Sequence, residues 1–438
     1  MKKIFLPFFL AIVLFFQNVY AQTIYFPPLN NSATWDTISP DSLGWCSDKI
    51  DTLYNFLQQE NTKGFIVLKD GRIVLEKYFG TFEKDSIWYW ASAGKTITSF
   101  LVGKAQEENY LSINDTSSDY LGVGWTNCTS QQEEKITIKN QLTMTTGLDD
   151  GVPDNYCTID TCLLYISDAG TRWAYHNAPY TLLEKVLSTA TSQPINSYTQ
   201  LRLKAQTGMT GFWLTVDFNN IFFSNVRSMA RYGLLIQNNA IWNSDTLLHD
   251  VNYINQMFNT SQSFNDSYGY LWWLNGKSSY MIPTVQTIIP GPFAPNAPPD
   301  MFAGLGKNGQ ILSISKDQGI VIVRMGEHPN SPASEIATIL CNQIWQKLND
   351  IMCISTDLDE SADLKNNITL YPNPAHSEIN ITPLEHENIV SDVFNLMGEK
   401  MITESSRNKI NISGLKGGIY ILQVKGAKNI YVQKFVKE

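Results

Sequence analysis

The sequence has no cluster of basic residues, and its acidic residues outnumber its basic ones. There are 41 Asp and Glu against 32 Lys and Arg, which gives a net charge of −9 at pH 7. Proteins that bind nucleic acid carry a basic patch or stripe, so this balance argues against a nucleic-acid partner. The chain also lacks a long apolar run after residue 21, and we therefore expect no membrane span in the mature protein.

Cysteine and histidine are too scattered for a zinc site. The six cysteines include no Cys-x-x-Cys pair, and the five histidines include no pair at ligand spacing, so we expect no metal. In an exported chain, cysteines can form disulfides instead. Cys157 and Cys162 flank a short polar loop and are the first predicted pair, and Cys341 with Cys353 is the second.

The N-terminus is typical of a secretory signal peptide. Met1, Lys2 and Lys3 precede an apolar run over residues 4–16, and Ala21 suits a cleavage site. The run is shorter than the roughly 20 residues that a membrane-spanning helix needs. We predict that residues 1–21 are a signal peptide and that the mature protein is secreted or attached to the cell surface.

Residues 22–352 alternate between helical and β-rich patterns. Residues 64–78 predict a hairpin around Asp70-Gly71, and residues 310–316 and 319–325 predict a second one. Apolar spacing predicts helices, which cover residues 47–60, 178–190, 226–237 and 331–348. We expect an α/β (α+β) fold: one antiparallel sheet built from both ends of the domain, flanked by helices, with a helical subdomain between.

Three further segments have a distinct composition. Residues 283–299 are rich in proline, and a loop of that length predicts a functional rim. Residues 353–367 are polar and charged and predict a linker. Residues 368–438 hold short alternating runs separated by glycine turns, which predicts a small all-β sandwich domain.

A hydroxyl and an amine lie one turn apart where an apolar helical pattern begins. Ser92 ends an aromatic run, and Lys95 shares the face of the first predicted turn. A neutral amine can take the hydroxyl proton, and the positive end of the helix dipole favours developing negative charge. Ser-x-x-Lys also occurs at residues 313–316 and 406–409, so a helix cap with a solvated lysine is the alternative.

Other familiar motifs are absent or incomplete. There is no Gly-x-Ser-x-Gly sequence, and only His176 among the histidines lies near a candidate site, so a Ser-His-Asp triad has little support. Residues 94–96 lack the first glycine of a phosphate loop, and residues 304–309 precede a strand instead of a helix. We therefore expect Lys and Tyr side chains to transfer the proton.

The Tyr175-x-Asn177 motif supplies a phenol and an amide. The alternatives are that Tyr175 is a core aromatic residue and that Asn177 is a helix cap.

Three motifs together resemble those of serine β-lactamases and penicillin-recognising enzymes, in order and in spacing: Ser92-x-x-Lys95, Tyr175-x-Asn177 and Lys307-Asn308-Gly309. The flanks at residues 90–96, 142–148 and 268–273 are similar to class C β-lactamase-like hydrolases. Residues 306–325 resemble the branch of 6-aminohexanoate-dimer hydrolases and esterases. The resemblance covers about residues 45–350, and it implies a β-lactamase-like fold without a metal or organic cofactor.

The resemblance also implies roles for individual residues. Ser92 would attack a carbonyl and form an acyl-enzyme, while Lys95 and Tyr175 share the work of the base. The backbone amides of Ser92 and Gln310 would stabilise the oxyanion, each such donor being worth about 3 kcal/mol. Asn177 would hold the substrate amide or orient Lys95.

The third motif leaves the substrate class open. Asn308 stands where relatives often have Thr or Gly, and many esterase relatives have His in place of Lys307. Lys307 would bind a carboxylate, with a lysine at a hairpin edge as the alternative, and Gly309 completes the motif. The expected substrate is a small-molecule amide or ester. A D,D-peptidase, a β-lactamase and a catalytically silent binding protein are the alternatives.

The C-terminal segment resembles the type IX secretion sorting domain. The resemblance covers about residues 368–438 and rests on residues 370–375, 417–424 and 434–437. It implies that the chain crosses the periplasm and outer membrane of a Gram-negative cell, with the type IX secretion machinery as a partner. A β-sandwich that binds carbohydrate is the alternative.

Overall fold

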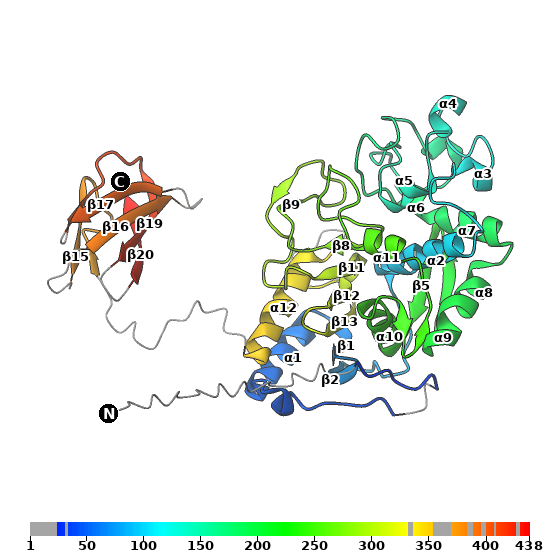
Figure 1. The fold of residues 1–438 in the computed structure, drawn as a ribbon, viewed down its shortest axis with the longest axis horizontal. Coiled ribbons are helices and arrows are strands. Elements are labelled where there is room, and N and C mark those ends of the chain that lie inside the picture. Colours follow the sequence, from blue (N-terminus) through cyan, green and yellow to red (C-terminus); the bar gives the residue numbers. More distant parts are fainter. Residues whose placement is uncertain are drawn as a thin grey trace, which may run out of the picture. The chain divides into compact units, whose positions relative to one another are not determined.

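The structure is a computed structural model, and it describes residues 24–30, 34–331, 336–353, 369–382, 389–395, 400–406, 409–425 and 430–438. The chain divides into two compact units, residues 1–354 and 355–438 (Figure 1). The predicted signal peptide lies outside the described residues, and so does nearly all of the predicted linker.

The first unit is built on a six-stranded antiparallel sheet with the order β2-β1-β13-β12-β11-β8. The strands are β1 (Thr62–Lys69), β2 (Arg72–Tyr78), β8 (Trp273–Leu274), β11 (Phe302–Gly306), β12 (Gln310–Ser315) and β13 (Ile320–Gly326). As predicted, both ends of the domain contribute strands. The first hairpin turns at Asp70 and Gly71, both with positive φ, the geometry that a two-residue turn between twisted strands requires.

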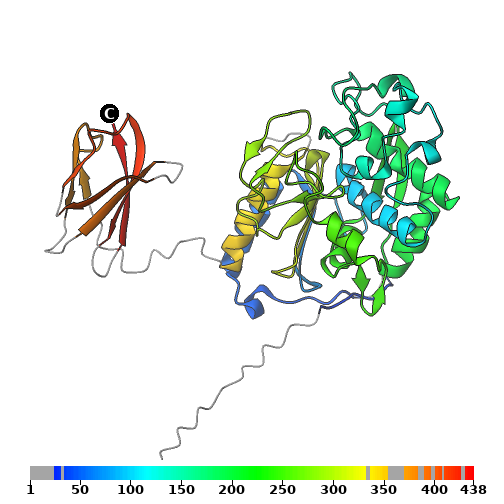
Figure 2. The same ribbon diagram turned by 45° about the horizontal axis from the view of Figure 1, so that its top comes forward.

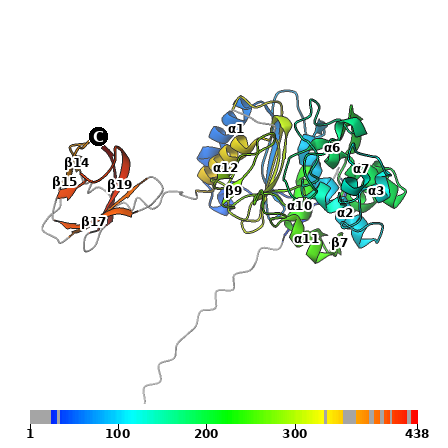
Figure 3. The same cartoon turned by 90° about the horizontal axis from the view of Figure 1, so that it is seen from above.

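Helices cover both faces of this sheet. On one face α1 (Ile50–Gln59) lies beside α12 (Thr338–Met352), and on the other α10 (Val226–Gln237) packs against β1, β12 and β13 (Figure 3). Every residue of β12 and β13 is buried, because both faces are covered. The helix predicted over residues 226–237 is confirmed. The one predicted over residues 331–348 begins later, because Ala337, with ψ 58°, is not helical.

A helical subdomain lies beyond α10, as predicted (Figure 2). The helix predicted over residues 178–190 is two helices that meet at Leu182. The helices are α2 (Lys95–Glu107), α3 (Ser118–Leu121), α4 (Ser130–Glu133), α5 (Ile138–Leu142), α6 (Asn177–Thr181), α7 (Leu183–Thr191), α8 (Ile195–Thr199), α9 (Ala205–Thr207) and α11 (Val251–Met257). Its short strands are β3 (Trp88–Tyr89), β4 (Phe212–Val216), β5 (Asn219–Ser224), β6 (Ile241–Trp242) and β7 (Asp245–Thr246). Strands β9 (Ser279–Tyr280) and β10 (Ile289–Pro290) pair with each other, and β9 lies on the side of β8 and α12 (Figure 1).

The second unit consists of two antiparallel sheets, which confirms the prediction of an all-β domain. The sheets have the orders β14-β15-β18 and β17-β16-β19-β20. Their strands are β14 (Thr369–Tyr371), β15 (Glu378–Thr382), β16 (Ile389–Asn395), β17 (Lys400–Ser406), β18 (Lys409–Asn411), β19 (Gly418–Lys425) and β20 (Ile430–Lys437). Leu370, Ile379, Leu422 and Phe435 belong to its separate apolar core.

One predicted disulfide is confirmed and the other is wrong. Cys157 pairs with Cys162, but Cys353 pairs with Cys46 instead of Cys341, at a Cα–Cα distance of 5.7 Å. Cys341 is buried within α12, and Cys353 follows the end of the same helix, roughly three turns or about 18 Å away. Because a disulfide needs Cα atoms within about 7 Å, those two residues cannot pair.

No helix within the described ranges is long and apolar enough to cross a membrane.

The disulfide between Cys46 and Cys353 closes the first unit and should carry much of its stability. We predict that replacing both cysteines with Ser lowers the free energy of unfolding by about 2–4 kcal/mol, since the sequence separation is 307 residues. Replacing Cys157 and Cys162, which are five residues apart, should cost less. Guanidinium unfolding followed by tryptophan fluorescence measures both, and an equal or larger loss for the short loop would contradict this account.

Candidate active site

Ser92 lies in a tight turn that precedes the helix. The turn is the 3₁₀ helix η3 (Ala91–Gly94), and α2 begins at Lys95 with Gly94 at its N-cap. The predicted helix start at Ser92 is therefore three residues early. Gly94 holds the N-cap position of α2, so Ser92 does not cap this helix, and its hydroxyl oxygen accepts a hydrogen bond from the Lys95 amine.

The backbone of this turn is held in an uncommon conformation. Ala91 has φ +47°, in the left-handed region that costs a non-glycine residue about 1–3 kcal/mol. Trp90 fixes the entry to the turn: its backbone amide donates to the carbonyl of Phe222 at 2.8 Å, and its indole nitrogen donates to Ser224 Oγ at 2.7 Å. These two hydrogen bonds to residues of β5 hold Trp90 in place, so they keep Ala91 in its left-handed conformation.

Lys95 is the centre of the site, and its side chain is only 3% exposed. Its Nζ donates to Ser92 Oγ at 3.0 Å and to Asn177 Oδ1 at 2.9 Å. The same nitrogen lies 3.9 Å from the ring centroid of Tyr180 and 5.2 Å from that of Tyr175. The alternative of a solvated lysine is therefore wrong.

Tyr175 and Asn177 come from the segment that leads into α6. Tyr175 is buried and stacks on Trp273 with a centroid distance of 5.7 Å, so it is a core aromatic as well as a neighbour of Lys95. Asn177 is the first residue of α6 and not its cap. Its side chain accepts from Lys95 and donates through Nδ2 to Asn155 Oδ1 at 2.9 Å.

The third motif, residues 307–309, forms a second turn, which hydrogen bonds from a buried arginine stabilise. This is the 3₁₀ helix η6 (Lys307–Gly309), and Arg324 Nη1 donates to the carbonyls of Asn308 and Gly309 at 2.7 and 2.8 Å. Gly309 has φ +75°, and a Cβ there would lie 2.5 Å from the same guanidinium. Lys307 is exposed, in keeping with a residue at the rim.

Strand β11 lies directly against the Ser92 turn, and its glycines allow the approach. A Cβ on Gly306 would lie 2.5 Å from the carbonyl oxygen of Trp90, and one on Gly304 would lie 2.9 Å from Thr96 Cγ2. This packing explains the glycines that mimic a dinucleotide motif. It also places η6, which follows Gly306, beside η3.

Gln310 has a structural task that the sequence does not predict. Its side chain is fully buried, donating through Nε2 to the carbonyl of Gly326 at 2.7 Å and accepting from the Gly326 amide at 3.1 Å. Nε2 also lies 3.3 Å from the carbonyl oxygen of Lys307. Gln310 therefore anchors η6 to β13, whatever its backbone amide contributes.

Sequence reasoning missed two residues of the site. Tyr180 lies three residues after Asn177 on α6, a helical spacing that could have identified it. Asn155 lies in a loop with no local sequence signal, and only the tertiary fold brings it to Asn177.

The described residues contain no group of His, Cys, Asp or Glu side chains that could hold a metal ion.

Two buried titratable groups lie close to these residues in the sequence. Burial raises the pKa of Glu184 to about 8, and the side chain of Asn220 opposes only part of the rise. Burial lowers the pKa of His176 to about 4, against the opposing effect of the Asp150 and Asp149 carboxylates. At neutral pH, therefore, His176 carries no charge.

The sequence model of the family described as Beta-lactamase matches residues 58–339, well over half of the chain. The chain belongs to the β-lactamase family. A second model, described as a secretion system C-terminal sorting domain, matches residues 369–438. The sorting domain directs the protein through type IX secretion to the cell surface or the extracellular space.

Relatives of this β-lactamase-family chain are distant. A Salmonella typhimurium protein named "Putative D-alanyl-D-alanine carboxypeptidase" is 23% identical over 416 residues, which cover 74% of this chain and 91% of that protein. A Bacillus subtilis protein named "Putative penicillin-binding protein PbpX" is 24% identical over 187 residues, covering 39% of this chain and 46% of the relative.

Solved structures share the β-lactamase-like fold. A Bacillus anthracis protein titled "Putative 6-aminohexanoate-dimer hydrolase" has a TM-score of 0.56 at 18% identity, over 75% of this chain and 88% of that one. A penicillin-binding protein homologue from Caulobacter crescentus has a TM-score of 0.51 at 11% identity, over 65% and 93%. The family and these folds support a serine hydrolase related to penicillin-binding proteins.

The buried carboxyl of Glu184 should make stability depend on pH. Its pKa is about 8 when folded, against about 4.3 in an unfolded chain. Between these values the folded state keeps a proton that the unfolded state releases. Stability is therefore lost as the pH rises toward 8, by up to about 1.4 kcal/mol per pH unit.

We predict that Glu184→Gln removes this dependence, so that the variant gains stability over the wild type as the pH rises from 5 to 8. Thermal unfolding at each pH measures the difference. Glu134→Gln, at an exposed site, is the matched control and should show a constant difference. A constant difference for Glu184→Gln as well would contradict the assignment.

Proposed function

We propose that this protein is a secreted serine hydrolase that cleaves a small-molecule amide or ester through an acyl-enzyme on Ser92. The observation that carries the proposal is the position of Lys95 Nζ, hydrogen-bonded to both Ser92 Oγ and Asn177 Oδ1. A hydroxyl becomes a nucleophile when a base lies within hydrogen-bond reach and a third group orients that base. Lys95 and Asn177 meet these two requirements.

In the first step, Lys95 and Tyr175 together take the proton of Ser92 while its Oγ attacks the substrate carbonyl. The tetrahedral intermediate then collapses and the C–O or C–N bond to the leaving group breaks. The base passes the proton that it took from Ser92 to the leaving group. Lys95 is placed for this task, because its Nζ lies 3.0 Å from Ser92 Oγ, within reach of the proton. In the second step a water molecule attacks the acyl-enzyme by the same proton transfers.

Two backbone amides would stabilise the negative charge of the intermediate. Ser92 would supply the first, and the family resemblance implies that Gln310 supplies the second. The backbone amide of Lys307 is a competing candidate. Lys307 directly follows Gly306, the last residue of β11, and Gly306 packs on the carbonyl of Trp90, close to the Ser92 turn. Both candidates lie at η6, which Arg324 and the Gln310 side chain hold rigid.

A D,D-carboxypeptidase is the second candidate, and a β-lactamase is the third. The names of the relatives favour the former, and the exposed Lys307 is a cation at the rim that suits a C-terminal carboxylate. The two alternatives differ from the main proposal only in substrate. A peptide ending in D-Ala-D-Ala, a chromogenic cephalosporin and a simple acyl ester separate them. The retained Ser92 and Lys95 pair argues against a silent binding protein.

We predict that the mature protein hydrolyses p-nitrophenyl acetate or butyrate and that Ser92→Ala lowers turnover by about a thousandfold or more, since it removes the nucleophile. Ser99→Ala is the matched control, because Ser99 is a buried serine on α2 that takes no part in the site. Equal turnover by wild type and Ser92→Ala would contradict the proposal. Lack of turnover of all three substrate classes by the wild type would favour a binding protein.

A further inference from the structure

Asn177 can orient Lys95 only if its own side-chain amide keeps one orientation. The two ends of an amide have similar shapes, and a half-turn of the group exchanges its oxygen and its nitrogen. Lys95 Nζ donates to Asn177 Oδ1 at 2.9 Å, so Nδ2 points the other way. Asn177 is 1% exposed, and a buried amide nitrogen needs a protein group that accepts its hydrogen.

Asn155 is that group, and it is bonded to the start of α6 twice. Its Oδ1 accepts from Asn177 Nδ2 at 2.9 Å, and its backbone carbonyl accepts from the amide of Ala178 at 3.0 Å. The first bond favours the orientation that presents Asn177 Oδ1 to Lys95, because the reversed amide would set two oxygens against each other. The second bond satisfies an amide of the first helical turn, where the helix itself offers no acceptor.

Little packing holds the loop that carries Asn155. Within residues 149–164 most side chains are exposed or half-buried, and the buried ones are those of Cys157 and Leu163. The ends of the loop meet, since the amide of its first residue donates to the carbonyl of its last at 2.8 Å. Loops with few buried contacts open easily, so the position of Asn155 depends on hydrogen bonds and on a covalent link.

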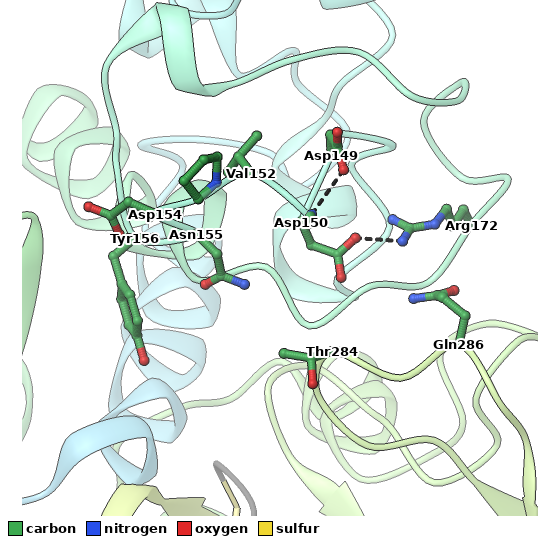
Figure 4. A pocket seen from close by; sticks show the side chains of 11 residues that line it. Asp149, Asp150, Val152, Asp154, Asn155, Tyr156, Arg172, Thr284 and Gln286 are labelled. Atoms are coloured by element: carbon green, nitrogen blue, oxygen red, sulfur yellow. Dashed lines mark hydrogen bonds and ion pairs between the residues drawn. The ribbon is translucent and has the colours of Figure 1, made fainter.

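Figure 4 shows this loop beside a cavity of about 450 Å³. Asn155 lines the cavity, and so do Thr284 and Gln286 of the proline-rich segment. The predicted rim, residues 283–299, therefore borders the same space. Asn155 lies between this space and the catalytic residues, and a shift of the loop would move it away from Asn177.

The disulfide between Cys157 and Cys162 supplies the covalent link. It closes the part of the loop that begins two residues after Asn155. Cys162 is followed by Leu163, which is fully buried in a small apolar cluster that also contains Ala178. The disulfide thus connects the segment that carries Asn155 to the cluster in which α6 begins, and this connection fixes the spacing between Asn155 and its partner on α6.

We propose that Asn155 is a positioning residue for the reaction, and that the disulfide between Cys157 and Cys162 holds it against Asn177. The inference rests on the proposed function and goes beyond it, because it assigns the group that orients Asn177 and the covalent link that holds that group. Asn155 acts through Asn177 and Lys95, without touching the reacting atoms itself.

Substitutions at Asn155 test the role of its side chain. Asn155→Leu removes the acceptor, and we expect kcat for p-nitrophenyl butyrate to fall by about ten- to a hundredfold while KM changes little. Asn155→Asp keeps the acceptor and should keep most of the activity at high pH. Its added negative charge favours the ammonium form of Lys95, so the acid limb of the pH profile of kcat should move to higher pH.

Asn127→Leu and Asn127→Asp are the matched controls, because Asn127 is an exposed asparagine of the same subdomain. Both should leave kcat and its pH profile unchanged. A residue with a merely structural role would lower kcat equally at every pH. Full activity of Asn155→Leu, or an equal loss in Asn155→Asp without a shift of the profile, would therefore overturn the proposal.

Serine variants of the two disulfides separate positioning from stability. Replacing both Cys157 and Cys162 should lower kcat by about tenfold and change the midpoint of thermal unfolding little, since the loop that they close is short. Replacing both Cys46 and Cys353 should lower the midpoint and leave kcat of the folded protein within about twofold. An unchanged kcat without the short disulfide would overturn the role given to it.

Hydrogen exchange separates failure of this proposal from failure of the proposed function, because it needs no turnover. Mass spectrometry measures exchange in peptides that cover residues 149–164 and 176–182. We expect faster exchange in both peptides for Asn155→Leu and for the variant without the short disulfide, and no change for Asn127→Leu. An inactive wild type with this pattern would overturn the proposed function and uphold the Asn155 contact. An active wild type whose exchange Asn155→Leu leaves unchanged would overturn the positioning role alone.

Discussion

The site depends on one buried amine, that of Lys95. A polar group removed from water is costly to bury unless hydrogen bonds compensate it. Ser92 and Asn177 supply two acceptors, and the ring centroid of Tyr180 lies 3.9 Å from the nitrogen. The same arrangement that makes burial tolerable also holds the amine against the hydroxyl that it would deprotonate.

The fold supplies these partners from distant parts of the chain. The Ser92 turn and α2 belong to the early part of the subdomain, Asn177 and Tyr180 to α6, and η6 to the sheet. Strand β11 reaches the Ser92 turn only because Gly304 and Gly306 lack side chains. The energy stored at Ala91 persists because Trp90 is bonded to β5, so the rigidity of the site comes from its surroundings.

Local features could be predicted from the sequence, because their causes are local. The Asp70-Gly71 hairpin follows from turn chemistry, and α10 follows from apolar spacing with Asn225 as its cap. The motifs at Ser92 and at Asn177 were recognisable by their order and spacing. The sequence did not reveal the contact of Asn155 with Asn177 or the disulfide of Cys46 with Cys353, because both join residues that only tertiary folding brings together.

The central claim is that Lys95 makes Ser92 a nucleophile, and covalent labelling tests it most directly. The wild-type protein is treated with a fluorophosphonate probe, the labelled peptide is mapped by mass spectrometry, and the rate is compared with that of Lys95→Met. Lys316→Met is the control, because Lys316 is another lysine packed on an aromatic ring. The account predicts one label, on Ser92, and a rate at least a hundredfold lower in Lys95→Met alone. A label on another residue, or an unchanged rate in Lys95→Met, would contradict it.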